Sequence, residues 1–429
     1  MAGIYLHIPF CKQACHYCNF HFSTSLTRKN DFVRALLAEI VLQKHYIGTE
    51  PVETIYFGGG TPSLLTAEEL TQIMEALQAS FTVDQEVEIT LEVNPDDVDR
   101  LSGKLGTWRT AGVNRLSMGI QSFFEEDLQW MNRAHTSGQA VTSIKMARDA
   151  GFDNISIDLI YGSPTLSDSH WQKNVEQALT LQIPHLSCYA LTVEPKTALD
   201  KMIRLKKKLA VDPDTQARQF LLLMDWLTKA GYEHYEISNF AMPGKRSRHN
   251  SSYWQGKPYL GLGPSAHSYN GVSRQWNAAN NALYIDTLLG AANPGTIHPE
   301  IAHPGIAGSI DGELKAGNPL MEKGSPLIEK EDLTPVQQLN EYIMISLRTM
   351  EGCDTGYIAD KFGEAAGNAL AAKAEHYVQE GKLNWEYQAG ANVESQALVD
   401  GISVRRQKLI LTREGKLLAD GIAADLFFE

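Results

Sequence analysis

The 429-residue chain has little cysteine, with five cysteines in all. So few thiols in so long a chain exclude a disulfide scaffold and are typical of a reducing compartment. The chain also lacks an apolar run long enough to span a bilayer, and its first residues lack the basic, apolar and small-residue order of a signal peptide. We therefore expect a cytoplasmic protein.

Positive charge is also scarce. The chain has 38 Lys and Arg against 51 Asp and Glu, so its formal net charge at pH 7 is −13. A protein whose main partner is a phosphate backbone presents a positive surface, so this composition argues against a nucleic-acid partner. The length exceeds what one ordinary core accommodates, and two or three domains are expected.

Three of the five cysteines, Cys11, Cys15 and Cys18, lie close together after an apolar run that predicts a strand at residues 4–8. Three thiolates can hold three irons of a cubane cluster and leave the fourth iron open to an outside ligand. The spacing C-x3-C-x2-C, with the aromatic Tyr17 before the last cysteine, is typical of the radical S-adenosylmethionine (SAM) superfamily. In that superfamily the open iron binds SAM.

A structural zinc site is the alternative interpretation of the same cysteines. His7, His16 or His21 can add an imidazole to the three thiolates, and sulfur with nitrogen suits tetrahedral zinc. Zinc sites usually contain two separated ligand pairs, however, and no second pair follows in this sequence. The iron–sulfur interpretation is therefore favoured.

Short apolar runs alternate with amphipathic helical patterns over residues 1–290. A strand that returns about every 30 residues, with a helix between, indicates βα units on a parallel sheet. Six or seven strands are too few to close an eight-stranded barrel, so this α/β domain should be an open, partial barrel with its site at the carboxyl ends of the strands. The predicted strands are 4–8, 54–57, 87–93, 115–120, 155–160, 186–191 and 234–238.

The remainder divides at a change of composition. Residues 291–332 are rich in glycine and proline without any period, which predicts an irregular loop or linker. Its His298 and His303 are candidate metal or haem ligands. Residues 333–429 show helices followed by two short strands, which resembles a winged-helix module. This smaller domain has nine basic and fourteen acidic residues, so we expect it to contact a protein or cover the barrel mouth.

A second motif follows one βα unit after the cysteines. The strand at 54–57 runs into Gly58-Gly59-Gly60-Thr61-Pro62, and glycines at a strand end let a ligand approach the backbone closely. Alone, a glycine triplet usually marks a tight turn. At this distance from the cysteines it matches the radical SAM motif that holds the methionyl amine.

Polar residues lie at the ends of later strands. Glu92, Gln121 and Asp158 end or interrupt apolar runs, and Arg133 follows the fourth predicted strand. Carboxylates and an amide can hydrogen-bond ribose hydroxyls, and an arginine can pair with a carboxylate. The alternative is that these groups only satisfy loop backbone.

The stretches around the three cysteines and the glycine triplet, together with residues 115–123, 132–135 and 157–162, resemble the oxygen-independent coproporphyrinogen III oxidase family of radical SAM proteins. The resemblance covers nearly the whole chain apart from the loop near 290–330. It implies that Cys11, Cys15 and Cys18 bind a [4Fe–4S] cluster. The residues that it implies for SAM are Tyr5, Tyr17, Gly59, Gly60, Thr61, Glu92, Gln121, Arg133, Asp158 and Ala190.

Within that family, three features resemble a haem chaperone branch more than the oxidases. The oxidases continue the cluster loop as Cys-x-Cys, whereas Asn19-Phe20 follows Cys18 here. They also carry an N-terminal extension, for which a first cluster cysteine at residue 11 leaves no room. The run from His249 to Trp254, His-Asn-Ser-Ser-Tyr-Trp, matches a motif associated with haem binding in the chaperones.

The resemblance implies a haem chaperone with one [4Fe–4S] cluster and SAM. Haem would contact His249, Asn250 and Tyr253, and it would pass to an acceptor haem protein, a transient membrane-protein client included. The preceding basic residues Lys245, Arg246 and Arg248 can pair with haem propionates. The alternative function is that of a coproporphyrinogen III oxidase, which decarboxylates two propionates through a 5′-deoxyadenosyl radical.

Overall fold

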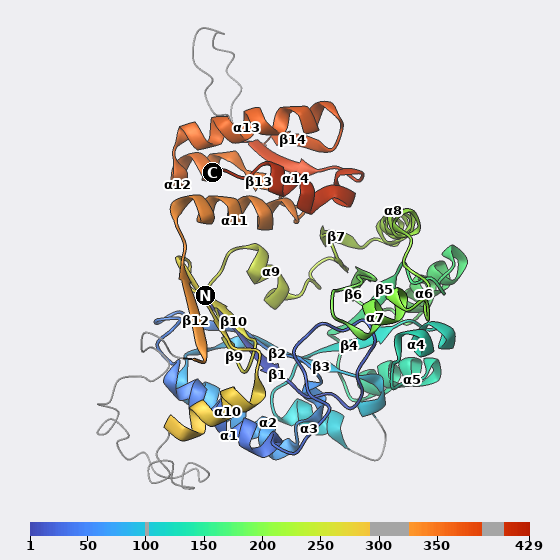
Figure 1. The fold of residues 1–429 in the computed structure, drawn as a ribbon, viewed down its shortest axis with the longest axis vertical. Helices are drawn as coiled ribbons and strands as arrows, with labels where there is room; N and C mark the ends of the chain where they lie inside the picture. Colours follow the sequence, from blue (N-terminus) through green and yellow to red (C-terminus); the bar gives the residue numbers. More distant parts are fainter. Residues whose placement is uncertain (99–102, 292–325, 388–406) are drawn as a thin grey trace.

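One large sheet forms most of the molecule, for which a computed structural model describes residues 1–98, 103–291, 326–387 and 407–429. The sheet has twelve strands, and its middle consists of six parallel strands in chain order (Figure 1). These strands are β1 (Ala2–Ile8), β2 (Val52–Gly59), β3 (Val83–Val93), β4 (Arg115–Gln121), β5 (Ile155–Tyr161) and β6 (His185–Ala190).

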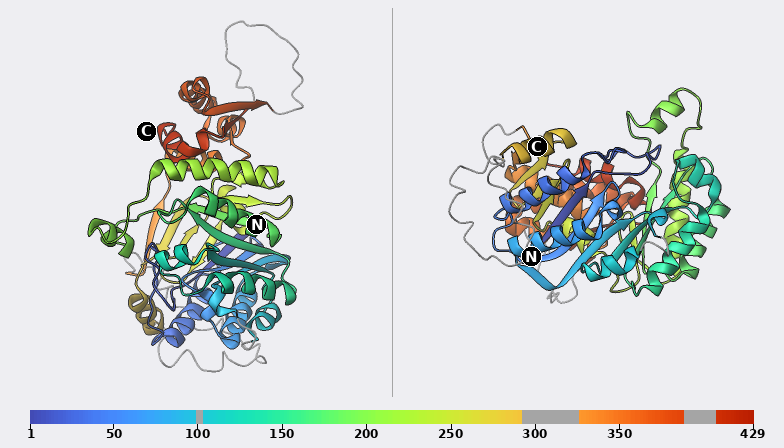
Figure 2. Two further views of the ribbon diagram at one scale, coloured as in Figure 1. Left: turned by 90° about the vertical axis from the view of Figure 1, so that its right-hand side faces the viewer. Right: turned by 90° about the horizontal axis from the view of Figure 1, so that it is seen from below.

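Helices between the strands cover the outer face of this parallel core (Figures 1 and 2). The side chains of β1 show why: Ile4, Leu6 and Ile8 are fully buried on the helix side, whereas Tyr5 and His7 alternate to the inner face. The helices of this layer are α1 (Lys29–Leu42), α2 (Ala67–Ser80), α3 (Lys104–Thr110), α5 (Ser137–Asp149), α6 (Asp168–Thr180) and α8 (Pro213–Lys229). Two shorter helices, α4 (Glu125–Met131) and α7 (Ala198–Arg204), instead contact the loop after β1 through backbone hydrogen bonds of Met131 and Leu199 with His16.

Shorter strands extend both edges of the parallel core. β8 (Asn239–Ala241) and β7 (Glu233–Glu236) follow β6 in antiparallel pairing. On the other side, β9 (Tyr259–Leu262) pairs parallel with β1. The antiparallel strands β10 (His267–Tyr269), β11 (Ser273–Asn277) and β12 (Ile328–Asp332) continue from it. Within the described residues the sheet ends at β12 and β7, so the predicted open barrel is confirmed.

β12 lies inside the interval 291–332 that the sequence predicted as irregular. For residues 328–332 that prediction is wrong. Their sequence, Ile-Glu-Lys-Glu-Asp, has no apolar alternation, and the strand forms because it pairs with β11 from Asn277↔Ile328 to Ser273↔Asp332. Most of the remaining interval, including His298 and His303, lies outside the described residues.

The C-terminal domain has its own core, which includes Leu339, Ile343, Leu370 and Leu409. Its three-stranded sheet has the order β13-β15-β14, and the element order helix–strand–helix–helix–strand–strand is that of a winged helix. Its elements are α11 (Pro335–Leu347), β13 (Cys353–Asp354), α12 (Thr355–Phe362), α13 (Glu364–Gln379), β14 (Leu383–Tyr387), β15 (Gln407–Leu411) and α14 (Ala419–Asp425).

The C-terminal domain lies at the end of the molecule opposite α1, α2 and α10 (Asn281–Ala291), with α9 (Arg248–Trp254) between it and the large sheet (Figure 1). An ion pair joins Arg274 of β11 to Glu341 of α11. Backbone amides add two further links, from Ile237 to the Arg348 carbonyl and from Met350 to the Tyr235 carbonyl. None of the described helices has the length and hydropathy that crossing a bilayer requires.

Candidate functional site: a cysteine loop beside an interdomain cavity

The three clustered cysteines lie in a loop that leaves the carboxyl end of β1 and folds back against it. Ser23 donates its amide to the Pro9 carbonyl at 2.8 Å, and its own carbonyl accepts from the Cys11 amide at 3.0 Å. The buried Phe10 anchors the loop by packing edge-on against Phe32, with 5.3 Å between ring centroids. We call residues 11–22 the cluster loop.

The thiols of the cluster loop suit a cubane. All three are free, and burial raises the pKa of Cys11 to about 11 despite a hydrogen bond with Thr61 and the Coulombic effect of Arg133. The charges of Cys15 and Cys18 also raise it, so the three thiols lie near one another. Within the described ranges, no three His, Cys, Asp or Glu side chains converge tightly enough to hold a single ion. A cubane binds each thiolate through a different iron, so three neighbouring thiols can hold three of its irons.

The glycine triplet at the end of β2 is required by close packing. A Cβ at Gly59, whose φ is +101°, would lie 2.6 Å from the His7 ring, and one at Gly60 would lie 2.6 Å from the Phe10 carbonyl oxygen. The Gly60 amide donates to the Ile8 carbonyl at 2.9 Å. The triplet therefore holds β2 against the base of the cluster loop, as well as leaving room for a ligand.

Two carboxylates, Glu92 of β3 and Asp158 of β5, face the inner side of the sheet from parallel strands that flank β4. Tyr56 donates its hydroxyl to Glu92 Oε1 at 2.8 Å. Burial raises the pKa of Glu92 to about 7 and that of Asp158 to about 6. Both groups can therefore change charge near neutral pH. We call Glu92, Asp158 and the neighbouring Arg133 the charged face.

Arg133 reaches this face from the loop after α4. Its guanidinium donates to Asn94 Oδ1 and to the Gly119 carbonyl, each at 2.7 Å, and to Cys15 Sγ at 3.3 Å. Its buried Nε has no hydrogen-bond partner among the described residues. This free donor beside a cluster thiol fits the role in SAM binding that the sequence predicted. Asn94, which also donates to Thr61 Oγ1 at 3.0 Å, is a contact that the sequence did not reveal.

The other predicted SAM residues lie around the same strand ends. Gln121 ends β4 with a strained φ of +64°, and its amide approaches Gly119 beside Arg133. Tyr17 packs on the apolar cluster that includes Met131 and Leu199. Ala190 ends β6 and is half-buried. The geometry thus gathers these residues around the ends of the parallel strands.

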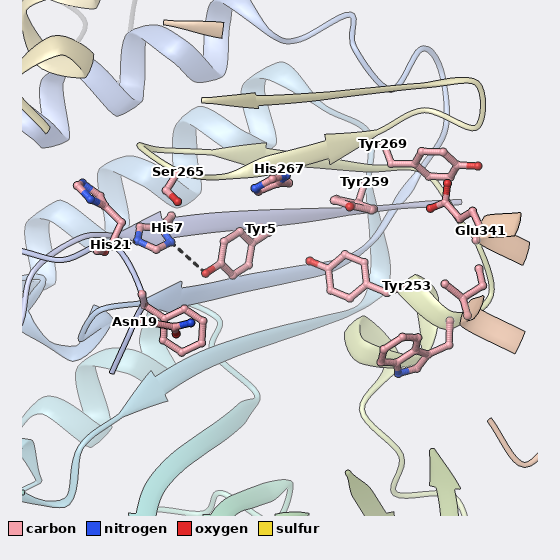
Figure 3. A pocket seen from close by; sticks show the side chains of 14 residues that line it. Tyr5, His7, Asn19, His21, Tyr253, Tyr259, Ser265, His267, Tyr269 and Glu341 are labelled. Atoms are coloured by element: carbon pink, nitrogen blue, oxygen red, sulfur yellow. Dashed lines mark hydrogen bonds between the residues drawn. The ribbon is translucent and has the colours of Figure 1, made fainter. Parts of the chain in front are cut away.

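A cavity of about 550 Å³ opens next to the cluster loop (Figure 3). Its walls come from the inner face of β1, the cluster loop, α9, β9, β10 and, across the domain boundary, α11. We call it the interdomain cavity. The side chains that line it include Tyr5, His7, Phe20, His21, Tyr253, Trp254, Tyr259, His267, Tyr269 and Glu341. The lining is aromatic and contains no lysine or arginine among these residues.

Of the three residues predicted to contact haem, only Tyr253 lines this cavity. His249 is buried behind it: Nε2 lies 2.8 Å from the Tyr253 hydroxyl oxygen, and Nδ1 lies 2.8 Å from Thr54 Oγ1. Burial lowers the pKa of His249 to about 3, so its ring is neutral. Asn250 lies in the first turn of α9, where its backbone amide donates a hydrogen bond to Oγ of Ser247, the N-cap residue.

The basic residues before this helix do not reach the cavity. Arg246 pairs with Glu233 at 2.9 Å and with Glu351 at 2.7 Å. Arg248 donates to the Glu86 carbonyl at 2.5 Å, and Lys245 is exposed. None of these three side chains lines the interdomain cavity, and their pairing with haem propionates stays a prediction.

The cavity also contains an imidazole that the sequence did not single out. His267 on β10 is exposed and stacks on Trp276 of β11, with 5.9 Å between ring centroids and 23° between planes. The surrounding protein removes part of the water around the ring, and this desolvation, followed by the charge of Arg274, lowers its pKa. No local pattern marks this residue, because β10 is only three residues long.

Comparison with known proteins defines the class first. Residues 5–178 match the Radical SAM superfamily. The fold resembles that of the coproporphyrinogen III oxidase HemN from Escherichia coli, a radical SAM enzyme, with a TM-score of 0.75 over 99% of this chain and 90% of that chain. Sequence identity is 21%, so this likeness concerns the fold alone. The chain is a radical SAM protein, and this class implies a [4Fe–4S] cluster and SAM.

Relatives that are more similar in sequence identify the family within the radical SAM class. The heme chaperone HemW of Bacillus subtilis is 30% identical over 425 residues, which is 98% of each chain. HemW of Mycobacterium tuberculosis H37Rv is 37% identical over 296 residues, 68% of this chain and 75% of the relative. The chain belongs to the HemW family, as the motifs indicated.

Proposed function

We propose that this chain is a haem chaperone: it binds haem in the interdomain cavity and passes it to an acceptor haem protein. The observation that carries the proposal is a cavity of about 550 Å³, lined by aromatic side chains and beside the cluster loop. That volume lies within the range of about 300–1,000 Å³ typical of ligand sites. The curated relatives are named as heme chaperones, which supports the same function.

The proposal includes one [4Fe–4S] cluster on Cys11, Cys15 and Cys18, with SAM bound at the charged face. In radical SAM proteins the reduced cluster supplies an electron to the sulfonium of SAM. Here Arg133 would orient the methionyl carboxylate through its free Nε, and the two carboxylates would hold ribose hydroxyls. The proposed acceptor is a haem protein, and the proposed clients include a membrane protein that binds the chaperone transiently.

The test is a haem transfer assay on the full chain, reconstituted anaerobically with iron and sulfide. The protein is loaded with ferric haem, separated from free haem, and mixed with excess apomyoglobin as a trap. We expect a stoichiometric Soret band before mixing and its replacement by the myoglobin spectrum afterwards. A wild-type protein that retains no haem after separation would contradict the proposal.

The same preparation tests the alternative function. The protein is incubated with coproporphyrinogen III, SAM and a low-potential reductant, and vinyl products are measured by chromatography and mass spectrometry. We expect none, because the oxidase family has a further cysteine where this chain has Phe20. Formation of the divinyl product would replace the chaperone proposal with the oxidase.

A further inference from the structure

Four imidazoles lie in or behind the interdomain cavity, and their hydrogen bonds differ. His7 has both nitrogens engaged, with the Tyr5 hydroxyl 3.3 Å from Nδ1 and the His21 carbonyl 2.8 Å from Nε2. His249 has both engaged as well, with Thr54 and Tyr253. The Nε2 of His21 lies 2.6 Å from Asn281 Oδ1. An imidazole binds iron through a nitrogen lone pair. The contacts of His7 and His249 leave no free lone pair, whereas His21 keeps one on Nδ1, because Asn281 Oδ1 can only accept a hydrogen bond from its Nε2.

His267 differs from the other three. Within the described part of the chain, neither of its ring nitrogens has a hydrogen bond, although its ring lines the cavity and is exposed. Stacking on Trp276 fixes the plane of the ring without using a nitrogen. The backbone beneath is also fixed, because His267 pairs with Trp276 in the β10–β11 register. The ring is therefore oriented while its lone pair stays available.

The surroundings of His267 suit a porphyrin. Tyr259 on β9 lies beside Tyr253 of α9 in an edge-to-face arrangement, with 4.6 Å between ring centroids. These rings and Tyr5 form an aromatic wall of the cavity that contains His267 (Figure 3). Arg274 of β11 is close enough to influence the charge of His267, and it pairs with Glu341. A haem propionate can compete with Glu341 for that guanidinium.

We infer that His267 is the iron ligand for haem in the interdomain cavity, and that His249 is a positioning residue which holds Tyr253 at the cavity wall. For His249 itself to reach iron, its ring would have to leave two hydrogen bonds, of which the one with Thr54 is buried. Loss of that bond leaves the buried Thr54 hydroxyl unsatisfied. The inference rests on the proposed function, because it assigns the ligand of the same cargo.

The test compares three variants of the reconstituted full chain: His267→Ala, His267→Met and His249→Gln. Ferric haem is titrated anaerobically, and the ferrous complexes are examined for the iron–histidine stretch by resonance Raman spectroscopy. We expect His267→Ala to lose that stretch and at least about tenfold in haem affinity. His267→Met should bind haem with a shifted spectrum. His249→Gln should keep the stretch, since the glutamine can still bond Tyr253.

Free imidazole provides the decisive control. Added to haem-loaded His267→Ala it should restore a histidine-like spectrum, because it can enter the space that the side chain vacated. Iron content and SAM affinity should equal those of wild type, which shows that the variant is folded. A wild-type spectrum in His267→Ala overturns the ligand assignment and leaves the chaperone proposal standing. Absence of haem binding by the wild-type protein overturns the proposed function.

Discussion

The charged face and the interdomain cavity adjoin through β1, yet their chemistry is opposite. The first brings Glu92 and Asp158, on the inner face of the parallel strands, near Arg133 from the loop after α4, and burial raises the pKa values of both carboxyls. The second is walled by tyrosines and imidazoles, and desolvation lowers the pKa values of His7 and His267. One side suits a small charged ligand and the other a large flat one.

This chemical difference follows from the elements that form the charged face and the interdomain cavity. The charged face is built on strands whose side chains alternate, apolar toward the helices and polar toward the inside. The cavity is built where β1 meets later, shorter elements and a second domain, so its lining is set by side chains from both ends of the chain. The two sites should therefore respond separately to mutation.

The largest effect should come from the cluster loop. Replacing Cys11, Cys15 or Cys18 with Ala should remove nearly all iron and the brown absorbance at ~400 nm, because the cubane needs three thiolates. Cys353→Ala is the matched control, since Cys353 is buried in the C-terminal core. Haem binding should persist in the loop variants, because none of the three thiols lines the cavity. Full iron content in any loop variant would exclude that cysteine as a ligand.

A smaller effect should follow from the charged face. Asp158→Asn should weaken SAM binding about ten- to a hundredfold, because one charge-assisted hydrogen bond contributes ~1.5–3 kcal/mol. Isothermal titration on the reconstituted protein measures it, with the exposed Asp153→Asn as control. Arg133→Ala should weaken SAM binding similarly but also disturb the cluster, since Arg133 donates to Cys15 Sγ. Unchanged SAM affinity in Asp158→Asn would remove this carboxylate from the site.

SAM binding at the charged face should depend on pH more strongly than haem binding in the interdomain cavity. Above pH values of about 6 for Asp158 and about 7 for Glu92, the carboxyls lose their protons, and the cationic sulfonium of SAM favours the ionised forms. SAM affinity should therefore rise with pH across this window, by about tenfold if SAM lowers one pKa by about one unit. Glu92→Gln should flatten the profile. A SAM affinity that falls with pH would contradict the assignment, whatever the haem affinity does.

Much of the parallel core could be predicted from the sequence, for a local reason. The six predicted strands from 4–8 to 186–191 overlap β1 to β6, because short apolar runs between helices determine them. The seventh, 234–238, overlaps β7 only in part, and β7 pairs antiparallel at the edge of the sheet. β9 escaped prediction because Tyr-Leu-Gly-Leu contains a glycine and gains its place only by pairing with β1, more than two hundred residues earlier. β13 is two residues long, too short for any periodicity.

The candidate sites divide in the same way. The cysteine spacing and the glycine triplet are contiguous motifs, so the sequence located that part directly. The cavity could not be located from contiguous motifs, because Tyr5, His267 and Glu341 come from β1, β10 and α11 and meet only in the folded chain. His249 was singled out from a contiguous run, but its ring turns inward to Thr54 and Tyr253.

The smallest effect should come from the residue that both sites share. Tyr5 lines the cavity, stacks on Tyr56 with 6.0 Å between ring centroids, and has its hydroxyl 3.3 Å from His7 Nδ1. Tyr5→Phe keeps the ring and removes one long hydrogen bond, worth about 0.5–1 kcal/mol. SAM and haem affinities, each titrated separately, should change by less than about fivefold. A change above tenfold in one affinity alone would show that the hydroxyl contacts that ligand directly, and the boundary between the two sites would then shift toward it.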